Sequence, residues 1–485
     1  MNDLTLSLRD GTRIVVPASL GAITTYALLE QETWFEKELR LLPHLLRPGM
    51  TAIDIGANLG VYSLAMSRLV GASGRVFAYE PTSTTRALLE RSRLENEASN
   101  LEISGFAISD GDRTGRIVFD GSSELNHLGT DGYGEEVEIT SLDAEAERRG
   151  WGDPDFLKVD AEGEEEAIIR GANRLLTESS PIVMLEIRAA EALNTGLVRM
   201  MSALGYAPYQ LLPGAPLLVP LDSSMVDGFE LNFLAMKADR AAELAARGLL
   251  VQAPARELGL TETEVAEALT TLRGQPFATA FPAQFADNVR IDPTYLKALA
   301  AYDIWRQEAQ PLARRWAALR YAMTSLIKLV DNEPTNARLA TLARIAFDTG
   351  RRSVIAPALQ LIFENMKTPP LALGEPFWPP SRRFDAISAA NPGMWFLAAA
   401  AEQIETNLSH SSAFIPPSET LGWLCRTSFA TAEMHRRQYL HALRTGKHMA
   451  APAMLLEDAP DNLNAPLWRD GSIAHLASTA PQASA

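Results

Sequence analysis

Short apolar runs alternate with amphipathic stretches through the first half of the chain. Five runs have the length and apolar character of buried strands: Thr51–Ile55, Arg75–Tyr79, Leu101–Ile108, Asp155–Val159 and Pro181–Ile187. Helical spacing lies between some of them, over Val61–Leu69, Thr84–Glu95 and Glu165–Leu176. Strands that alternate with helices pair in parallel, carry helices on both faces and are joined by right-handed crossovers. The pattern therefore predicts an α/β fold with a doubly wound, mostly parallel sheet.

Other runs depart from this alternation. Leu4–Leu8 and Thr12–Val16 flank an Asp10-Gly11 turn and predict an N-terminal hairpin, which a helix over about Trp34–Leu46 follows. Two runs predict an inserted or edge hairpin: Gly115–Phe119 and Glu135–Thr140. Three more predict the last strands of the sheet, antiparallel at its edge: Tyr206–Leu211, Pro216–Val219 and Leu231–Met236.

Beyond about residue 238 the sequence is rich in Ala and Leu at helical spacing. The predicted helices are Ala241–Gly248, Thr261–Leu272, Pro293–Asp331, Asn336–Asp348, Ser353–Met366 and Met394–Thr406. The segment 336–366 has the pattern of a tetratricopeptide-like helix pair, although two ordinary packed helices give the same pattern. We therefore expect a sheet domain over 1–238, an all-α domain over 239–450 and a loose tail over 451–485.

Composition narrows the class of protein. Apolar residues make up 47% of the chain and charged residues 21%, as in folded domains. The formal charge of -16 repels phosphate backbones, so we expect no nucleic-acid partner. A single cysteine, Cys425, excludes an internal disulfide. The N-terminus lacks a signal-peptide pattern and no apolar run reaches ~20 residues, so we expect a cytoplasmic protein without a membrane span.

The first informative motif is Asp54-Ile55-Gly56-Ala57-Asn58-Leu59-Gly60, between a predicted strand and a predicted helix. Gly56 and Gly60 let backbone pass close to a ligand, and the helix beyond offers unpaired N–H groups. Asn58 stands where the dinucleotide motif G-x-G-x-x-G has a glycine. The motif therefore favours a nucleoside cofactor that lacks a pyrophosphate.

A second motif, Glu80-Pro81, ends the next predicted strand twenty residues later. A carboxylate in this position accepts hydrogen bonds from both ribose hydroxyls of a nucleoside that lies across the strand ends. Taken singly, Asp54 could cap a helix or turn, and Glu80 could be a solvated strand end. Together they indicate an adenosine-containing cofactor.

The complete set of motifs resembles the FkbM family of methyltransferases. The resemblance rests on Asp54–Gly60 with Val61-Tyr62-Ser63, Glu80-Pro81, Ser141-Leu142-Asp143, Phe156–Gly163 and Gly171-Ala172, within roughly Glu32–Lys237. It implies a class I, Rossmann-like fold, S-adenosylmethionine as cofactor, and O-methylation of a sugar, glycan or secondary metabolite. It also implies that the cofactor is bound by six residues: Asp54, Gly56, Asn58, Gly60, Glu80 on the ribose, and Asp110 on the adenine side.

Methylation of a hydroxyl needs a group that takes its proton. Asp160 and Glu162 follow the strand Asp155–Val159, where ligands bind in such sheets, so one of them could be the base. The alternatives are that the two hold a divalent ion, or that Asp160 orients the cofactor while Glu162 caps the next helix. His127, in the polar loop Asp120–Gly134, is a third catalytic candidate or a plain surface histidine, and Glu186 a strand-end carboxylate of open role.

Two other classes of protein stay open at this point. A nicotinamide-dependent oxidoreductase uses a similar sheet, but the middle glycine and a Y-x-x-x-K pair are missing. A scaffold protein would use the helical half to bind a partner and keep a weak or inactive methyltransferase site. The helical half could also cover the cleft, form a homo-oligomer or recognise the acceptor, and the sequence does not decide among these roles.

Overall fold

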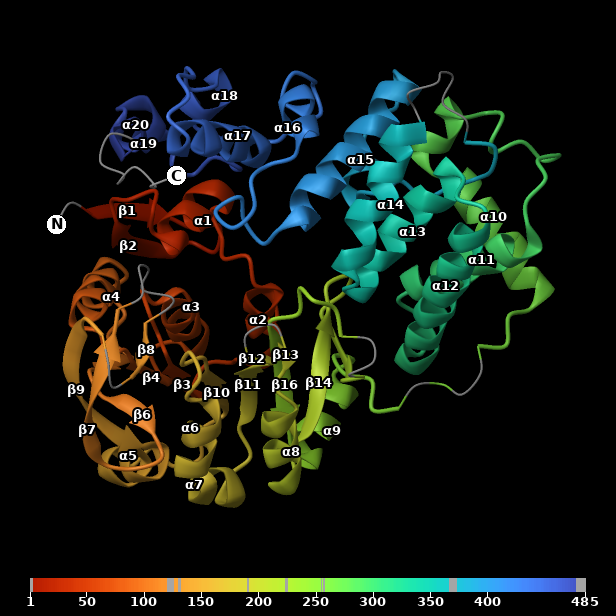
Figure 1. Ribbon diagram of the computed structural model, residues 1–485. Coiled ribbons are helices and arrows are strands. Elements are labelled where there is room, and N and C mark those ends of the chain that lie inside the picture. Colours follow the sequence, from red (N-terminus) through yellow and green to blue (C-terminus); the bar gives the residue numbers. More distant parts are fainter. Residues whose placement is uncertain are drawn as a thin grey trace.

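The computed structural model describes residues 3–119, 126–129, 132–189, 192–222, 226–253, 255, 258–365 and 373–476. An eight-stranded sheet forms the centre of the N-terminal half (Figure 1). In spatial order its strands are β15 (Leu217–Pro220), β14 (Ala207–Leu212), β16 (Asn232–Met236), β11 (Ile182–Glu186), β10 (Phe156–Val159), β3 (Thr51–Ile55), β4 (Arg75–Tyr79) and β5 (Leu101–Ser104). β5, β4, β3, β10 and β11 pair in parallel, whereas β16 is antiparallel to β11 and β14, and β15 to β14. The predicted doubly wound, mostly parallel sheet is confirmed.

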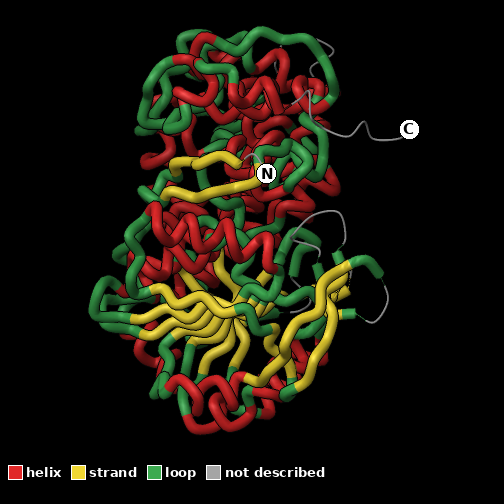
Figure 2. Tube along the Cα trace, turned by 90° about the vertical axis from the view of Figure 1, so that its left-hand side faces the viewer, coloured by secondary structure: helices red, strands yellow, loops and turns green. Residues whose placement is uncertain are grey.

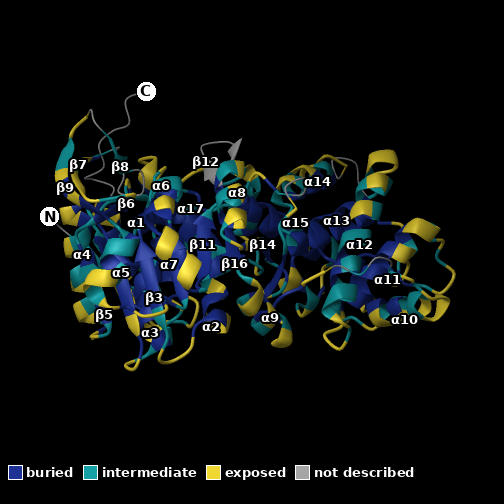
Figure 3. Ribbon diagram, turned by 90° about the horizontal axis from the view of Figure 1, so that it is seen from below, coloured by how far each residue is buried: buried dark blue, intermediate teal, exposed yellow. Residues whose placement is uncertain are grey.

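Helices cover both faces of this sheet, so the side chains of β3 are buried on both of its faces. Ala52 packs on the face covered by α3 (Val61–Val70), α4 (Ser83–Glu95) and α9 (Ala238–Ala246). Ile53 and Ile55 pack on the other, covered by α5 (Leu142–Arg149), α6 (Glu165–Gly171), α7 (Asn173–Glu178) and α8 (Thr195–Ala203). The strands are the most deeply buried part of this layer (Figure 3).

A small second sheet stands beside the carboxyl ends of the main strands (Figure 2). Its order is β6 (Ala107–Ser109), β9 (Gly134–Ser141), β7 (Arg113–Val118) and β8 (His127–Leu128). The predicted run Leu101–Ile108 is therefore two strands, because the chain leaves the main sheet after Ser104 and pairs with β9 from Ala107. A two-stranded ribbon, β12 (Arg188–Ala189) with β13 (Ala192–Leu193), follows β11.

Both ends of the chain form one layer above the sheet domain (Figure 1). The predicted hairpin is present as β1 (Asp3–Ser7) and β2 (Arg13–Pro17), followed by α1 (Ile23–Gln31). Four C-terminal helices pack on it: α17 (Ala432–Arg444), α18 (Ala453–Leu456), α19 (Ala465–Arg469) and α20 (Ser472–Leu476). Buried ion pairs join the two ends of the chain within this layer, with Arg437 Nη2 2.9 Å from Glu30 Oε1 and Arg436 Nη1 3.5 Å from Glu32 Oε2.

The helical half has a hydrophobic core of its own. It contains α10 (Glu262–Arg273), α11 (Pro293–Arg306), α12 (Leu312–Asn332), α13 (Asn336–Thr349), α14 (Arg352–Asn365), α15 (Pro392–Leu408) and α16 (Glu419–Leu424). The hairpin β14–β15 joins the two halves, because Leu212 and Leu217 pack in the helical core while Leu211 and Leu218 pack in the core of the sheet domain. The helical half is therefore docked against the sheet domain and not merely tethered to it.

Several sequence predictions need correction. Residues 453–476 are helical and packed, so the loose tail expected from residue 451 is wrong for this segment, and residues 477–485 lie outside the described residues. The boundary expected near residue 238 falls later, because α9 packs on the sheet domain. The predicted helix Trp34–Leu46 is shorter, a 3-10 turn Lys37–Arg40 and α2 (Leu42–Leu45), and Pro293–Asp331 breaks between α11 and α12. Among the described helices, none is both long and apolar enough to cross a membrane.

Candidate active site

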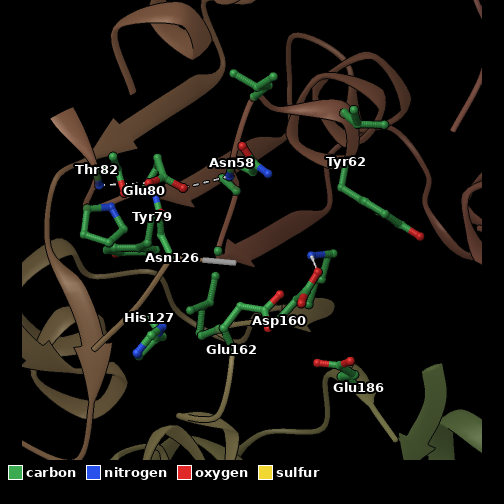
Figure 4. Close-up of a pocket in the computed structure, with 18 of the residues that line it drawn as sticks. Asn58, Tyr62, Tyr79, Glu80, Thr82, Asn126, His127, Asp160, Glu162 and Glu186 are labelled. Atoms are coloured by element: carbon green, nitrogen blue, oxygen red, sulfur yellow. Dashed lines mark hydrogen bonds and ion pairs between the residues drawn. The ribbon is translucent and has the colours of Figure 1, made fainter. Parts of the chain in front are cut away.

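A cavity of about 330 Å³ opens at the carboxyl ends of β3, β4, β10 and β11 (Figure 4). The strand order changes direction between β3 and β10, and ligands of such sheets bind outside the strand ends at this point. Of the nine site residues predicted from the sequence, six line the cavity: Gly56, Asn58, Glu80, His127, Asp160 and Glu162. The three others are Asp54, Gly60 and Asp110.

The loop after β3 forms one wall of the cavity. Gly56 has φ +73°, and a Cβ atom there would lie 1.7 Å from the carbonyl oxygen of Asp160, so only glycine fits. Asn58 also has a positive φ of 50°, and its Oδ1 is buried without a hydrogen-bond partner among the described residues. Gly60 serves packing, because a Cβ atom at this residue would lie 2.2 Å from Leu89 Cδ1.

Glu80 is held in the wall by backbone donors of the neighbouring loops. Its Oε2 accepts the N–H of Asn58 at 2.9 Å and its Oε1 the N–H of Thr82 at 2.8 Å (Figure 4). The residue is 6% exposed, and this burial raises the pKa of its carboxyl to about 7 despite both hydrogen bonds. Each carboxylate oxygen keeps a second lone pair for a ligand in the cavity.

Asp54 lies beneath the loop and does not line the cavity. It is fully buried; its Oδ2 accepts the hydroxyl of Ser63, and its Oδ1 lies 3.8 Å from Lys158 Nζ. Lys158 is buried as well and donates to Asp160 Oδ2 at 2.8 Å. Burial alone would lower the pKa of Lys158, but the nearby carboxylates of Asp160 and Asp54 hold it above its ordinary value. Asp54 thus supports the loop through α3 and Lys158.

Four carboxyl groups gather on the opposite wall: Asp160, Glu162, Glu186 and Glu36. Burial and the charges of Asp160 and Glu162 raise the pKa of Glu186 to about 8. Glu36 accepts hydrogen bonds from Trp34 Nε1, Tyr62 Oη and Asn232 Nδ2, and burial with the charge of Asp160 raises its pKa. Sequence reasoning missed Glu36, because its segment 32–36 lies before the first strand of the main sheet and follows no motif.

The small sheet contributes the remaining wall. His127 is not in a loop, because it lies on β8 and pairs with Val118 of β7. It lines the cavity beside Leu128 and Ile117, and residues 120–125 and 130–131 of the predicted loop lie outside the described residues. The small sheet thus brings His127 to the cavity.

Asp110, expected on the adenine side of the cofactor, does not line the cavity. It is exposed and forms ion pairs with Arg113 Nη1 at 2.6 Å and Arg170 Nη2 at 3.9 Å. The cause is the turn after Ser109, which directs the chain into β7. Apolar side chains line the cavity in this region instead: Phe106, Ala107 and Ile108.

The sheet order and the strand-end cavity define a class I methyltransferase fold. Residues 54–208 match the family model described as "Methyltransferase FkbM domain", so this segment is an FkbM methyltransferase domain and the predicted resemblance is confirmed. The predicted site residues all lie within the matched segment. The search of curated proteins gives no match.

Solved structures of methyltransferases resemble part of the chain. Methyltransferase FkbM from Methylobacillus flagellatus KT is 18% identical over 40% of this chain and 48% of its own, with a TM-score of 0.28. The chain thus spans about half the length of that protein. A SAM-dependent O-methyltransferase from Thermotoga maritima is 19% identical over 41% and 64%, with a TM-score of 0.26. Aeropyrum pernix fibrillarin, in complex with natively bound S-adenosyl-L-methionine, is 12% identical over 49% and 99%, with a TM-score of 0.26.

Proposed function

We propose that this chain is an S-adenosylmethionine-dependent O-methyltransferase. The observation that carries the proposal is the Glu80 carboxylate, which the backbone N–H groups of Asn58 and Thr82 hold at the end of β4 beside the Gly56–Gly60 loop. A carboxylate in this position binds a ribose diol. The match of residues 54–208 to an FkbM methyltransferase domain supports the same cofactor.

The residues of the cavity fit this cofactor. Glu80 would hold the ribose, and the apolar group Phe106, Ile108 and Ile117 would contact the adenine ring. The methionine end would lie over the loop at Gly56 and Asn58, whose unpartnered Oδ1 is an acceptor for an ammonium group. When bound, S-adenosylmethionine supplies an activated methyl group on its sulfonium, so the protein must align the acceptor oxygen and exclude water.

Glu186 is the best general base at the site. A base works best when its pKa lies near the working pH, and the pKa of Glu186 is about 8. Asp160 already accepts a hydrogen bond from Lys158. Glu162 is exposed at the mouth. We therefore assign the proton of the acceptor hydroxyl to Glu186, and keep Asp160, Glu162 and His127 as contacts of the acceptor or cofactor.

Transfer of a labelled methyl group from S-adenosylmethionine to hydroxylated acceptors, with sugars and glycans first, tests this proposal. We expect label in a methyl ether, which survives mild alkali, and at least a 100-fold slower transfer in Glu186→Gln. Glu178→Gln, an exposed glutamate at the end of α7, is the matched control and should transfer normally. Label that alkali releases as methanol would show a methyl ester and contradict methylation of a hydroxyl, and label on nitrogen would contradict O-methylation.

A further inference from the structure

A second, larger cavity of about 870 Å³ lies between the sheet domain and the helical half. We call it the interdomain cavity. One side is built by the segment 31–44 and the turn between β14 and β15, and the other by α13, the start of α14 and the end of α15. Its size is at the upper end for a small-molecule site.

Packing holds the walls of the interdomain cavity in place. A Cβ atom on Gly214, in the turn between β14 and β15, would lie 2.7 Å from the Cα atom of Asp348 at the end of α13, so the two halves are in direct backbone contact. Asp227 Oδ2 accepts the backbone N–H of Ser353 at 3.0 Å and also its hydroxyl. The cavity is therefore preorganised, which lowers the entropic cost of binding.

The interdomain cavity adjoins the candidate active site. Phe35, Glu36 and Leu231 line both cavities. The ring of Phe35 lies 5.2 Å from that of His410 in the interdomain cavity and 5.7 Å from that of Phe414 in the active site. The Phe35–Glu36 segment and Leu231 thus form a wall that the two cavities share.

The lining is locally basic in a chain whose net charge is -16. Seven lysines and arginines line it: Arg9, Lys37, Arg40, Arg352, Arg382, Arg383 and Arg437. Five glutamates oppose them: Glu36, Glu38, Glu230, Glu402 and Glu433. Burial raises the pKa of Glu38 to about 8, so this carboxyl is largely neutral at pH 7. Five of the seven cations form salt bridges: Arg9 with Glu433, Lys37 with Glu230, Arg382 with Asp348, Arg383 with Glu402 and Arg437 with Glu30. Among the described residues, Arg40 and Arg352 have no carboxylate in salt-bridge distance.

Arg352 is a largely buried cation of this lining. It forms no salt bridge with a carboxylate among the described residues, although burial lowers its pKa only to about 10 and it stays charged. It donates to His410 Nδ1 at 2.9 Å and stacks on Phe229. Burial lowers the pKa of His410 to about 3, so its ring is neutral. Since Nδ1 accepts the hydrogen bond from Arg352, the ring hydrogen is on Nε2. Arg352 Nε, His410 Nε2 and the buried Gln403 Nε2 all lack hydrogen-bond partners among the described residues.

We propose that the interdomain cavity is part of the acceptor site. It binds the oxyanion, a phosphate or a carboxylate, of a polyhydroxylated acceptor near Arg352 and Arg383, while the hydroxyl that is methylated lies beside Glu186 in the active site. The unpartnered buried donors of Arg352, His410 and Gln403 favour oxyanion oxygens as their partners. The helical half would then have a direct part in substrate recognition. This inference rests on the proposed function, because an acceptor site has meaning only beside a methyl donor.

Calorimetric titration of the full chain, saturated with S-adenosylhomocysteine, tests the acceptor site. The probes are glucose 6-phosphate for a phosphate, glucuronate for a carboxylate, inorganic phosphate for the anion alone, and glucose for the neutral sugar. We expect at least one of the two anionic sugars to bind at least 10-fold more tightly than glucose and more tightly than inorganic phosphate. In Arg383→Gln, whose parent side chain is 37% exposed, that binding should weaken at least 10-fold. Arg290→Gln, an exposed arginine outside both cavities, should bind like the parent.

Three results would overturn the inference: no binding of either anionic sugar at 10 mM, equal binding of glucose, or binding that Arg383→Gln leaves unchanged. Arg40→Gln, at an exposed cavity residue, repeats the test should Arg383→Gln fail to fold. Titration of S-adenosylhomocysteine alone separates this outcome from failure of the proposed function. If it binds while the sugars do not, the acceptor site is wrong and the cofactor site stands; if it does not bind, the proposed function fails first.

Discussion

Replacement of Glu80 should weaken the cofactor site in a way that can be calculated from its contacts. Each hydrogen bond from a ribose hydroxyl to the ionised carboxylate is worth about 1.5 kcal/mol or more. Loss of both in Glu80→Ala removes about 3 kcal/mol, which is roughly a 100-fold increase in the Kd for S-adenosylhomocysteine. Glu80→Gln keeps the shape and one acceptor oxygen, so its Kd should rise about 10-fold.

The pH dependence of binding gives a second readout of the same residue. The pKa of the Glu80 carboxyl is about 7 in the free protein, and a ribose diol donates only to its ionised form. The affinity of the parent should therefore fall by up to about tenfold per pH unit below pH 7. The affinity of Glu80→Gln should lack this component. Isothermal titration at pH 6, 7 and 8 measures both effects, with Glu178→Ala as an exposed control. An alanine variant that is folded and binds within twofold of the parent would refute the placement of the ribose.

Three further predictions concern buried charge. The folded pKa of Glu186 (about 8) exceeds its ordinary value, so the free energy of unfolding of the parent should fall by about 2 kcal/mol relative to that of Glu186→Gln as pH rises from about 5 to 8, after allowance for partial exposure. Urea unfolding across this range measures the difference, and a difference that does not change with pH would argue against a raised pKa. Arg437→Met should lower the free energy of unfolding by about 3–5 kcal/mol, because it leaves buried Glu30 without its cation. Addition of Glu30→Gln should restore much of this loss, and additive losses in the double variant would show that the pair does not act as a unit. Asp54→Ala should lower the free energy of unfolding by about 3 kcal/mol through loss of its contacts with Ser63 and Lys158, and a loss below 1 kcal/mol would mean that the residue does not support the loop.

The sheet could be predicted from the sequence because its signals are local. β3 and β4 are apolar runs that end at a turn or a Glu-Pro pair, and both strands have the predicted bounds. The prediction of one strand over Leu101–Ile108 was wrong, because apolar character does not show that the chain passes from one sheet to another at Gly105-Phe106.

The packing of the C-terminal segment could not be predicted in this way. Arg437 and Glu30 are 407 positions apart, and neither is unusual in its own neighbourhood. The residues 453–476 form helices of only four or five residues, whose stability comes from packing on β1 and β2 and not from helical periodicity.

The candidate site was predictable where motifs follow strands and not elsewhere. Asn58, Glu80 and Asp160 come directly after β3, β4 and β10, so the topology alone brings them to one edge. Asp110 also follows a strand, but that strand belongs to the small sheet and leads away from the cavity. Glu36 reaches the site by tertiary packing, through hydrogen bonds from Tyr62 and Asn232.

Calorimetric titration of the purified full chain with S-adenosylhomocysteine, with NADH as the control ligand, tests the central claim most directly. The account predicts saturable 1:1 binding of S-adenosylhomocysteine and no binding of NADH, because the loop after β3 has Asn58 in place of the glycine that a pyrophosphate requires. A folded sample that binds neither ligand, or that binds NADH, would contradict the assignment of the cavity as a methyltransferase cofactor site.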